Sequence, residues 1–168
     1  MLCDLLRFTP NIGDCSYDNY SVTGQTSAQQ LTVMQGVDLT QYQYVTILVG
    51  ANDVQGAISP DTFVANVTSM VALCIASGAI PIVGLFPVFS TNAVTGYGKT
   101  TTNYQLSPVY ISKLKKYCIE NNVKMADVRF NFGDNLQWYN DNIHGNESGD
   151  IAITRAFYNA IRSIEDAR

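Results

Sequence analysis

A short run of apolar and β-branched residues, 44–49, is followed at once by Gly50, Ala51, Asn52 and Asp53. A nearly continuous apolar run of this length predicts a strand that is buried on both faces, as in a parallel sheet. Open α/β sheets bind ligands just past the carboxyl ends of such strands. The amide of Asn52 could there donate a hydrogen bond to negative charge developing on a reacting oxygen. Asn52 and Asp53 are also common turn formers, so an ordinary strand-to-helix turn is the alternative.

Strand-like and helix-like patterns alternate along the rest of the chain. Helices are favoured where an N-cap residue precedes the apolar periodicity, at Thr26 or Ser27, and where proline follows serine, at Ser59-Pro60 and Ser107-Pro108. A last helix is expected over about 150–164, and Leu2 to Leu6 fit the last turn of another. The expected strands are residues 19–23, 44–49, 80–85 and 123–128, and residues 89–105 form a long polar loop. This alternation predicts one α/β domain with a mainly parallel sheet.

Composition narrows the range of functions. The chain has 168 residues, of which 46% are hydrophobic and 14% charged, so it is an ordered domain whose surface is covered mostly by uncharged polar residues. Its net charge of −4, without a Lys/Arg cluster, argues against a nucleic acid or an anionic membrane as partner. The four cysteines lack metal-like spacing, so no metal is expected, and the sequence suggests no other cofactor. No glycine-rich phosphate loop follows a strand, which disfavours a nucleotide-binding domain.

A second polar cluster contains the only histidine, His144, three residues after Asp141. An imidazole titrates near neutrality and can take a proton from a hydroxyl and return it to a leaving group. A carboxylate bonded to its other nitrogen would fix the tautomer and stabilise the imidazolium. Taken alone, this pair is more simply explained as a histidine in a surface loop.

Together, Gly50-Ala51-Asn52-Asp53 and Asp141-Asn142-Ile143-His144 resemble the SGNH (GDSL-type) hydrolase family, which carries Gly-x-Asn-Asp in one block and Asp-x-x-His in its last. Residues 19–27 resemble another block of the family, a strand ending in a glycine before a helix. The resemblance implies a three-layer α/β/α, flavodoxin-like fold and a serine esterase. It also implies that His144 is the general base, that Asp141 orients it, and that Gly24 and Asn52 form the oxyanion hole. Gly50 and Asp53 belong to the Gly-x-Asn-Asp motif and support the resemblance, without an assigned catalytic role.

The family's first block, a strand followed by Gly-Asp-Ser that supplies the nucleophile, has no counterpart in this sequence. Gly13-Asp14-Cys15-Ser16 is the nearest match, and a thiolate could replace the alkoxide. However, no apolar strand precedes Gly13, and too few residues follow Cys15 to form the intervening helix. Cys15 and Ser16 are therefore weak candidates, and Ser27, at a helix start, is weaker still. A Cys3–Cys15 disulfide is a further possibility.

In the family this first strand lies inside the sheet, so losing it would leave two rows of backbone groups unpaired, at roughly 1–3 kcal/mol for each buried group. Three explanations are open. The chain could be a fragment, or a neighbouring chain or upstream segment could complete the sheet. Alternatively, this protein could depart from the family's arrangement of strands. We favour residues 1–168 as a domain of a longer protein. The first seven residues lack a signal-peptide pattern, and the polar composition suits an extracellular or virion-associated protein such as a phage tail or tailspike.

Two functions follow from the resemblance. The first is a carbohydrate O-acetyl esterase whose serine lies outside this chain, acting on acetylated carbohydrate or another ester. The second is an inactive glycan-binding or structural domain on the same scaffold, with Tyr97, Tyr104, Trp138 and Tyr139 as exposed rings for stacking on sugars.

Overall fold

The computed structural model describes residues 2–7, 9, 12–87, 106–132, 136–140 and 144–168. Its α-helices are α1 (Leu2–Leu6), α2 (Ser27–Gln35), α3 (Ala51–Gln55), α4 (Pro60–Ala76), α5 (Ser107–Glu120), α6 (Val128–Phe132) and α7 (Glu147–Glu165). The strands are β1 (Tyr44–Ile47), β2 (Ile80–Gly84) and β3 (Lys124–Ala126). Two 3₁₀ turns, Leu39–Gln41 and Leu136–Trp138, complete the described elements.

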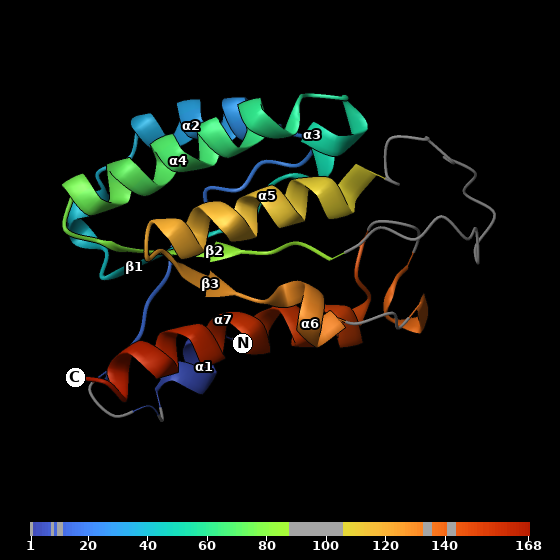
Figure 1. The fold of residues 1–168 in the computed structure, drawn as a ribbon. Coiled ribbons are helices and arrows are strands. Elements are labelled where there is room, and N and C mark those ends of the chain that lie inside the picture. The colour runs from blue at the N-terminus through green and yellow to red at the C-terminus, as the bar shows by residue number, and fades with distance from the viewer. Residues whose placement is uncertain (1, 8, 10–11, 88–105, 133–135, 141–143) are drawn as a thin grey trace.

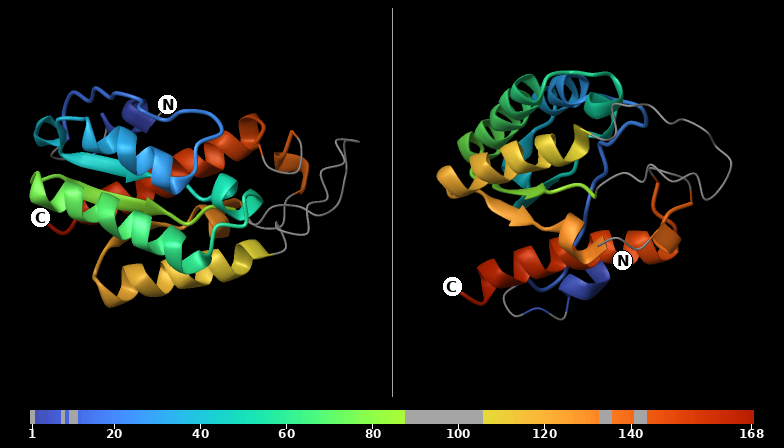
Figure 2. Two further views of the ribbon diagram at one scale, coloured as in Figure 1. Left: turned by 90° about the horizontal axis from the view of Figure 1, so that it is seen from above. Right: turned by 45° about the vertical axis from the view of Figure 1, so that its right-hand side comes forward.

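The sheet is parallel, with strand order β1-β2-β3. Tyr44 lies opposite Ile80 in the first pair, and Ile82 lies opposite Lys124 in the second. Helices cover both faces (Figures 1 and 2), with α2, α4 and α5 in one layer and α1, α6 and α7 in the other. The predicted three-layer α/β/α fold is confirmed.

The layer of α2, α4 and α5 is tightly packed. The N-cap residue Ser59 accepts a hydrogen bond from the backbone of Thr62, and proline follows it as the sequence predicts. From α4, Phe63 is fully buried and packs its ring against Phe86 and Tyr110 at centroid distances of 6.0 and 5.8 Å. Cys118 of α5 is also fully buried in this core.

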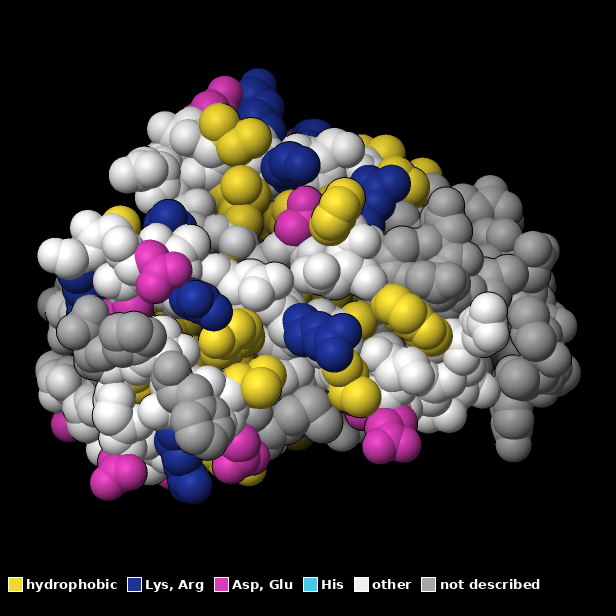
Figure 3. All heavy atoms as spheres, turned by 90° about the horizontal axis from the view of Figure 1, so that it is seen from below, with side chains coloured by type: hydrophobic (Ala, Val, Ile, Leu, Met, Phe, Trp, Pro, Cys, Tyr) yellow, Lys and Arg dark blue, Asp and Glu magenta, His cyan; other side chains and the backbone are white. Residues whose placement is uncertain are grey.

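The opposite layer has its own core, built around α7. This helix starts at the N-cap Asn146, whose side-chain oxygen accepts from the backbone of Ser148 and Gly149. Phe157 and Ile161 pack from α7 toward Ile82 of β2 and Leu6 of α1 in one apolar cluster. On the outer side of this layer, acidic, basic and apolar side chains are interspersed over the described residues (Figure 3).

Two expectations for the sheet are wrong. Residues 19–23 are not a strand, although they run beside β1, because no neighbouring strand among the described residues pairs with them. Strand β1 is shorter than residues 44–49 and is not buried on both faces: Thr46 is exposed, and Leu48 beyond the strand end is 38% exposed. The predicted loop at residues 89–105 lies outside the described residues.

The cysteines divide between the two layers. Cys3 and Cys15 form a disulfide, whereas Cys74 and Cys118 are buried free thiols in the α4–α5 layer. Burial raises the pKa of Cys74 to about 12 and that of Cys118 to about 11.

Within the described ranges, no cluster of three or more potential metal ligands occurs. None of the helices described is both long and apolar enough to cross a membrane.

Candidate active site

Gly50 makes the turn at the carboxyl end of β1. Its φ of 129° is rarely adopted by residues with a side chain. A Cβ added at Gly50 would also lie 2.9 Å from Cδ1 of the Phe86 ring. A glycine is therefore required here on two independent grounds, and the sharp turn starts α3 directly at the end of the sheet.

Asp53, in the first turn of α3, has a structural role. It is fully buried and accepts hydrogen bonds from the backbone N–H of Ser27 at 2.9 Å and from the Ser27 hydroxyl at 2.5 Å. Asn66 of α4 donates to the same hydroxyl at 2.9 Å. The carboxylate thus stabilises the N-terminus of α2, where helix backbone N–H groups lack partners. This network joins α2, α3 and α4.

Asn52, one residue earlier, bonds to the segment just before α2. Its side-chain nitrogen donates to the carbonyl oxygen of Gln25 at 2.9 Å, which places it beside Gly24. A primary amide has two N–H donors, so one remains for a ligand after this bond. Gly24 has a φ of 82°, and a Cβ there would meet no atom within 4 Å. The structure therefore brings together the ends of residues 18–25 and of β1.

His144 lies in the segment that leads into α7. A backbone hydrogen bond of 2.8 Å from Asn140 to the carbonyl of His144 and a bridge between Tyr139 and Gly145 hold this segment in place. The His144 residue is exposed. Asp141, its expected orienting carboxylate, lies outside the described residues. The general-base pair therefore remains a prediction.

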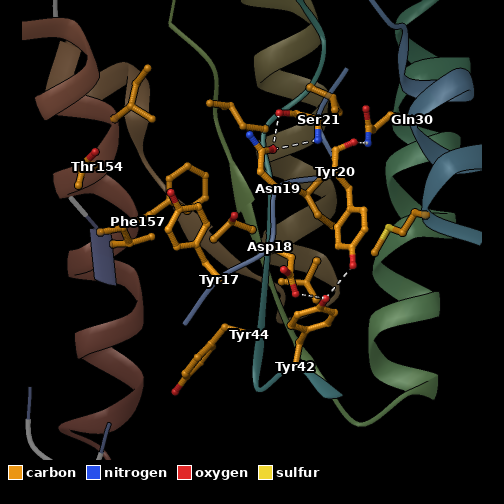
Figure 4. A pocket seen from close by; sticks show the side chains of 18 of the residues that line it. Tyr17, Asp18, Asn19, Tyr20, Ser21, Gln30, Tyr42, Tyr44, Thr154 and Phe157 are labelled. Atoms are coloured by element: carbon orange, nitrogen blue, oxygen red, sulfur yellow. Dashed lines mark hydrogen bonds between the residues drawn. The ribbon is translucent and has the colours of Figure 1, made fainter. Parts of the chain in front are cut away.

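A large cavity connects these residues. It has a volume of about 1360 Å³, and Gly24, Asn52 and His144 all line it, together with Gly50. The cavity runs along β1 between that strand and residues 16–25 (Figure 4). Pockets for small molecules usually measure about 300–1,000 Å³, so this one is larger than a single small ligand requires.

The chain's own nucleophile candidates do not fit the site. Cys15 is in the disulfide with Cys3, so it has no thiol to ionise. Ser16 lines the cavity, but it precedes Asp18, which bonds to Tyr42 at the amino end of β1. Asn52 lies past the carboxyl end of that strand. Ser27 is fully buried in the Asp53 network. None of the three is placed to attack an ester held near Asn52.

Two of the four aromatic residues expected to stack on sugars, Trp138 and Tyr139, lie among the described residues. Tyr139 is 9% exposed and belongs to the core beside α7, so its assignment as an exposed ring is wrong. Trp138 packs against the same core and is partly buried. Tyr97 and Tyr104 lie outside the described residues.

Sequence reasoning missed a polar cluster at the amino end of β1. The Tyr42 hydroxyl donates to Asp18 at 2.6 Å and lies 2.9 Å from the Tyr20 hydroxyl (Figure 4). The hydrogen bond to Asp18 raises the pKa of Tyr42. Gln30 of α2 donates to the carbonyl oxygen of Tyr20 at 2.9 Å. No local sequence pattern links Asp18 to Tyr42, because the contact depends on how two segments lie side by side.

A buried carboxylate, also missed, lies near the same end. Glu165 of α7 is 2% exposed and accepts hydrogen bonds from Tyr44 and Gln43, and Arg168 pairs with it at 3.0 Å. Burial, followed by the contact with Glu165, raises the pKa of Tyr44 to about 12. The other oxygen of Glu165, Oε2, has no hydrogen-bond partner among the described residues.

Comparison with known proteins identifies a family and several structures that resemble this chain. The sequence model of the GDSL-like lipase/acylhydrolase family matches residues 5–150. No curated protein matches. A catalytic mutant of Axe2, an acetylxylan esterase from Geobacillus stearothermophilus, superposes with a TM-score of 0.75 at 20% identity, covering 95% of this chain and 78% of that one. A GDSL-like lipase from Bacteroides thetaiotaomicron gives 0.71 at 21% identity, covering 84% and 73%.

A lipolytic protein of the G-D-S-L family from Veillonella parvula also superposes, with a TM-score of 0.71 at 15% identity over 91% of this chain and 82% of that one. At these identities the superpositions establish the fold, which agrees with the family match. Nothing in these comparisons bears on the expected phage-tail origin, which stays a prediction.

Proposed function

Since the chain belongs to the GDSL-like lipase/acylhydrolase family, we propose that it is an SGNH-type esterase that removes O-acetyl groups from carbohydrate. In this proposal His144 is the general base and Asp141 orients it. Gly24 and Asn52 stabilise the oxyanion, and the nucleophilic serine comes from polypeptide outside residues 1–168. The observation that carries the proposal is that Gly24, Asn52 and His144, from three distant parts of the sequence, line one cavity.

The chemistry assigned to each residue follows from its position. The serine oxygen attacks the acetyl carbonyl while His144 takes the serine proton, and His144 then returns that proton to the departing sugar hydroxyl. Negative charge on the carbonyl oxygen is stabilised by the Gly24 N–H and by the Asn52 N–H that does not bond to Gln25. Water then hydrolyses the acetyl-enzyme with His144 again as the base, which releases acetate.

The choice of carbohydrate as the substrate is supported less directly than ester hydrolysis itself. The family match supports ester hydrolysis, and one structural relative is named as an acetylxylan esterase. Two others are named only as lipases or lipolytic proteins. Acetylated xylooligosaccharides and a long-chain nitrophenyl ester are therefore the two substrates to compare.

The proposal is tested by acetate release from acetylated xylooligosaccharides, with the protein supplied with a peptide strand that ends in Gly-Asp-Ser. Replacing one member of such a triad costs several powers of ten, so we expect His144→Gln to reduce release by at least about 10³-fold. Glu120→Gln, at the exposed end of α5, is the control and should leave the rate unchanged. Equal rates for the His144→Gln variant and the parent would contradict the assignment.

A second candidate is a glycan-binding or structural domain without catalysis. It is favoured by one observation: Cys15 is held in a disulfide and Ser27 is buried in the Asp53 network, so neither is available as a nucleophile. Saturable binding of the oligosaccharide without acetate release, even when a serine strand is bound, would favour this function over the first.

A further inference from the structure

Three polar side chains from three helices form a network that includes the residue next to Asn52. The Asp53 carboxylate accepts hydrogen bonds from both donors of Ser27, and the side-chain amide of Asn66 contacts the Ser27 hydroxyl at 2.9 Å. Ser27 and Asp53 are fully buried, whereas Asn66 is half-buried. The motif at the end of β1 accounts for Asp53, but neither the sequence nor the proposed chemistry gives a role to Asn66.

The direction of each hydrogen bond in this network follows from the groups that form it. A carboxylate only accepts, so the single proton of the Ser27 hydroxyl lies on the bond to Asp53. The hydroxyl oxygen is then left as an acceptor, so the nitrogen of the Asn66 amide, and not its oxygen, faces it and donates. Asn66 therefore fixes the rotation of the Ser27 hydroxyl, and with it one of the two bonds that hold the Asp53 carboxylate.

Two consecutive residues of α3 hold the segment that follows Gly24. Asn52 donates to the carbonyl oxygen of Gln25 at 2.9 Å, and Asp53 accepts from the N–H of Ser27 at 2.9 Å. The segment is thus fixed to α3 at two points that are two residues apart. Helix α3 has only five residues, too few to be stable alone, so its orientation depends on such contacts. The position of Gly24 relative to Asn52 therefore depends on the bonds between Ser27 and Asp53.

Asn66 connects this unit to a firmly packed helix. It belongs to α4, which has 17 residues, and lies one helical turn after Phe63 and one turn before Met70. Both of these neighbours are buried, and the Phe63 ring packs against the rings of Phe86 and Tyr110. Helix α4 therefore holds the Asn66 amide at a fixed place against the start of α2.

We propose that Asn66 is a positioning residue for the oxyanion hole: its hydrogen bond to Ser27 keeps Gly24 and Asn52 at the separation that binds the developing negative charge. This role rests on the proposed function, in which Gly24 and Asn52 supply the two N–H donors. Asn66 acts on them only through Ser27 and Asp53. Without the Asn66 amide, the bond to Asp53 alone restrains the hydroxyl, and the two donors are placed less precisely.

The first measurement uses the chain alone and follows hydrogen exchange of the Ser27 N–H by nuclear magnetic resonance. Asn66→Leu has nearly the same size but no donor, and we expect it to speed this exchange at least about tenfold. Asn66→Gln keeps an amide donor and should restore the slow exchange. Ser69→Ala, one turn along α4 at an exposed position, is the control and should match the parent. Native protection of the β2 amides shows that each variant is folded. Unchanged exchange of Ser27 in Asn66→Leu would overturn the proposal.

The second measurement is catalytic and uses acetate release with the serine strand at saturation. Oxyanion donors act on the transition state, so Asn66→Leu should lower kcat by about 10- to 100-fold and change KM by less than about twofold. Asn66→Gln should recover most of the loss, and Ser69→Ala should show none.

The two proposals fail in different ways. A parent chain that releases no acetate contradicts the esterase assignment and, with it, the positioning role, even if Ser27 exchange responds as expected. An active parent whose Asn66→Leu variant keeps its full kcat contradicts the positioning role alone. A rise in KM without a fall in kcat also contradicts it, because the residue would then act on substrate binding.

Discussion

The two edges of β1 differ in almost every physical respect. On one side, β1 pairs in parallel with β2, and its side chains join a core that includes the fully buried Phe63. On the other side, the same strand faces a cavity of about 1360 Å³, and no strand among the described residues pairs with it. The contrast teaches that one strand can be paired and packed along one edge while no described strand pairs with its other edge.

The largest expected contrast comes from truncating apolar side chains on the two sides. Phe63→Ala should lower the free energy of unfolding by about 3–5 kcal/mol, because it empties a fully packed position. Ile153→Ala, at the cavity wall, should cost about 1 kcal/mol, since part of its surface is already open. Urea unfolding measures both. Equal losses would mean that the cavity side is as tightly packed as the core.

Proline substitutions compare the two edges at neighbouring residues. Val45→Pro removes an N–H that donates to Ile80 of β2 and should destabilise the protein by roughly 3 kcal/mol. Thr46→Pro should cost less than about 1 kcal/mol, because its N–H points into the cavity. Thermal unfolding monitored by circular dichroism gives both values. A larger loss for Thr46→Pro than for Val45→Pro would reverse the assignment of the edges.

The adjacent motif residues Asn52 and Asp53 provide the next comparison. Asp53→Ala leaves the buried N–H and hydroxyl of Ser27 without their acceptor, so we expect a loss of about 2 kcal/mol. Asn52→Ala removes one bond to Gln25 at a partly exposed position and should cost less than about 1 kcal/mol. Its main effect should be on ester hydrolysis, measured with the serine strand present. A larger loss of stability for Asn52→Ala than for Asp53→Ala would contradict a structural role for Asp53 and a catalytic role for Asn52.

The smallest effect concerns the thiols of the packed side. Because burial raises the pKa of Cys74 to about 12 and of Cys118 to about 11, iodoacetamide at pH 8 should modify neither in the folded protein. The stability contributed by these raised pKa values is complete below about pH 8 and is lost as the pH rises through 11 to 12. Mass spectrometry of the denatured, unreduced chain should show adducts on these two residues only, since Cys3 and Cys15 are paired. Rapid labelling of folded Cys74 would contradict its burial.

Much of the fold could be predicted because its signals are local. Ser59-Pro60 and Ser107-Pro108 mark helix starts that the structure confirms, and the apolar run after residue 43 marks β1. The family follows from motifs that retain their order and is confirmed. The role of Gly50 at a tight turn was also predictable from its place after the strand.

The failures concern features that depend on a missing or distant neighbour. Residues 19–23 have strand-like composition, but a strand forms only where a partner supplies hydrogen bonds. The burial of Tyr139 and the contact between Asp18 and Tyr42 depend on tertiary packing, which no spacing rule reports. The disulfide was only one possibility for Cys3 and Cys15 until the structure brought them together.

The most direct test of the contrast between the two edges of β1 is hydrogen exchange of its amides in the protein alone, followed residue by residue by nuclear magnetic resonance. Val45 and Ile47 should be strongly protected, because their N–H groups donate to β2, whereas Tyr44 and Thr46 should exchange at least about tenfold faster. Uniform protection of all four amides would show that the outer edge of β1 is already paired and would contradict this contrast.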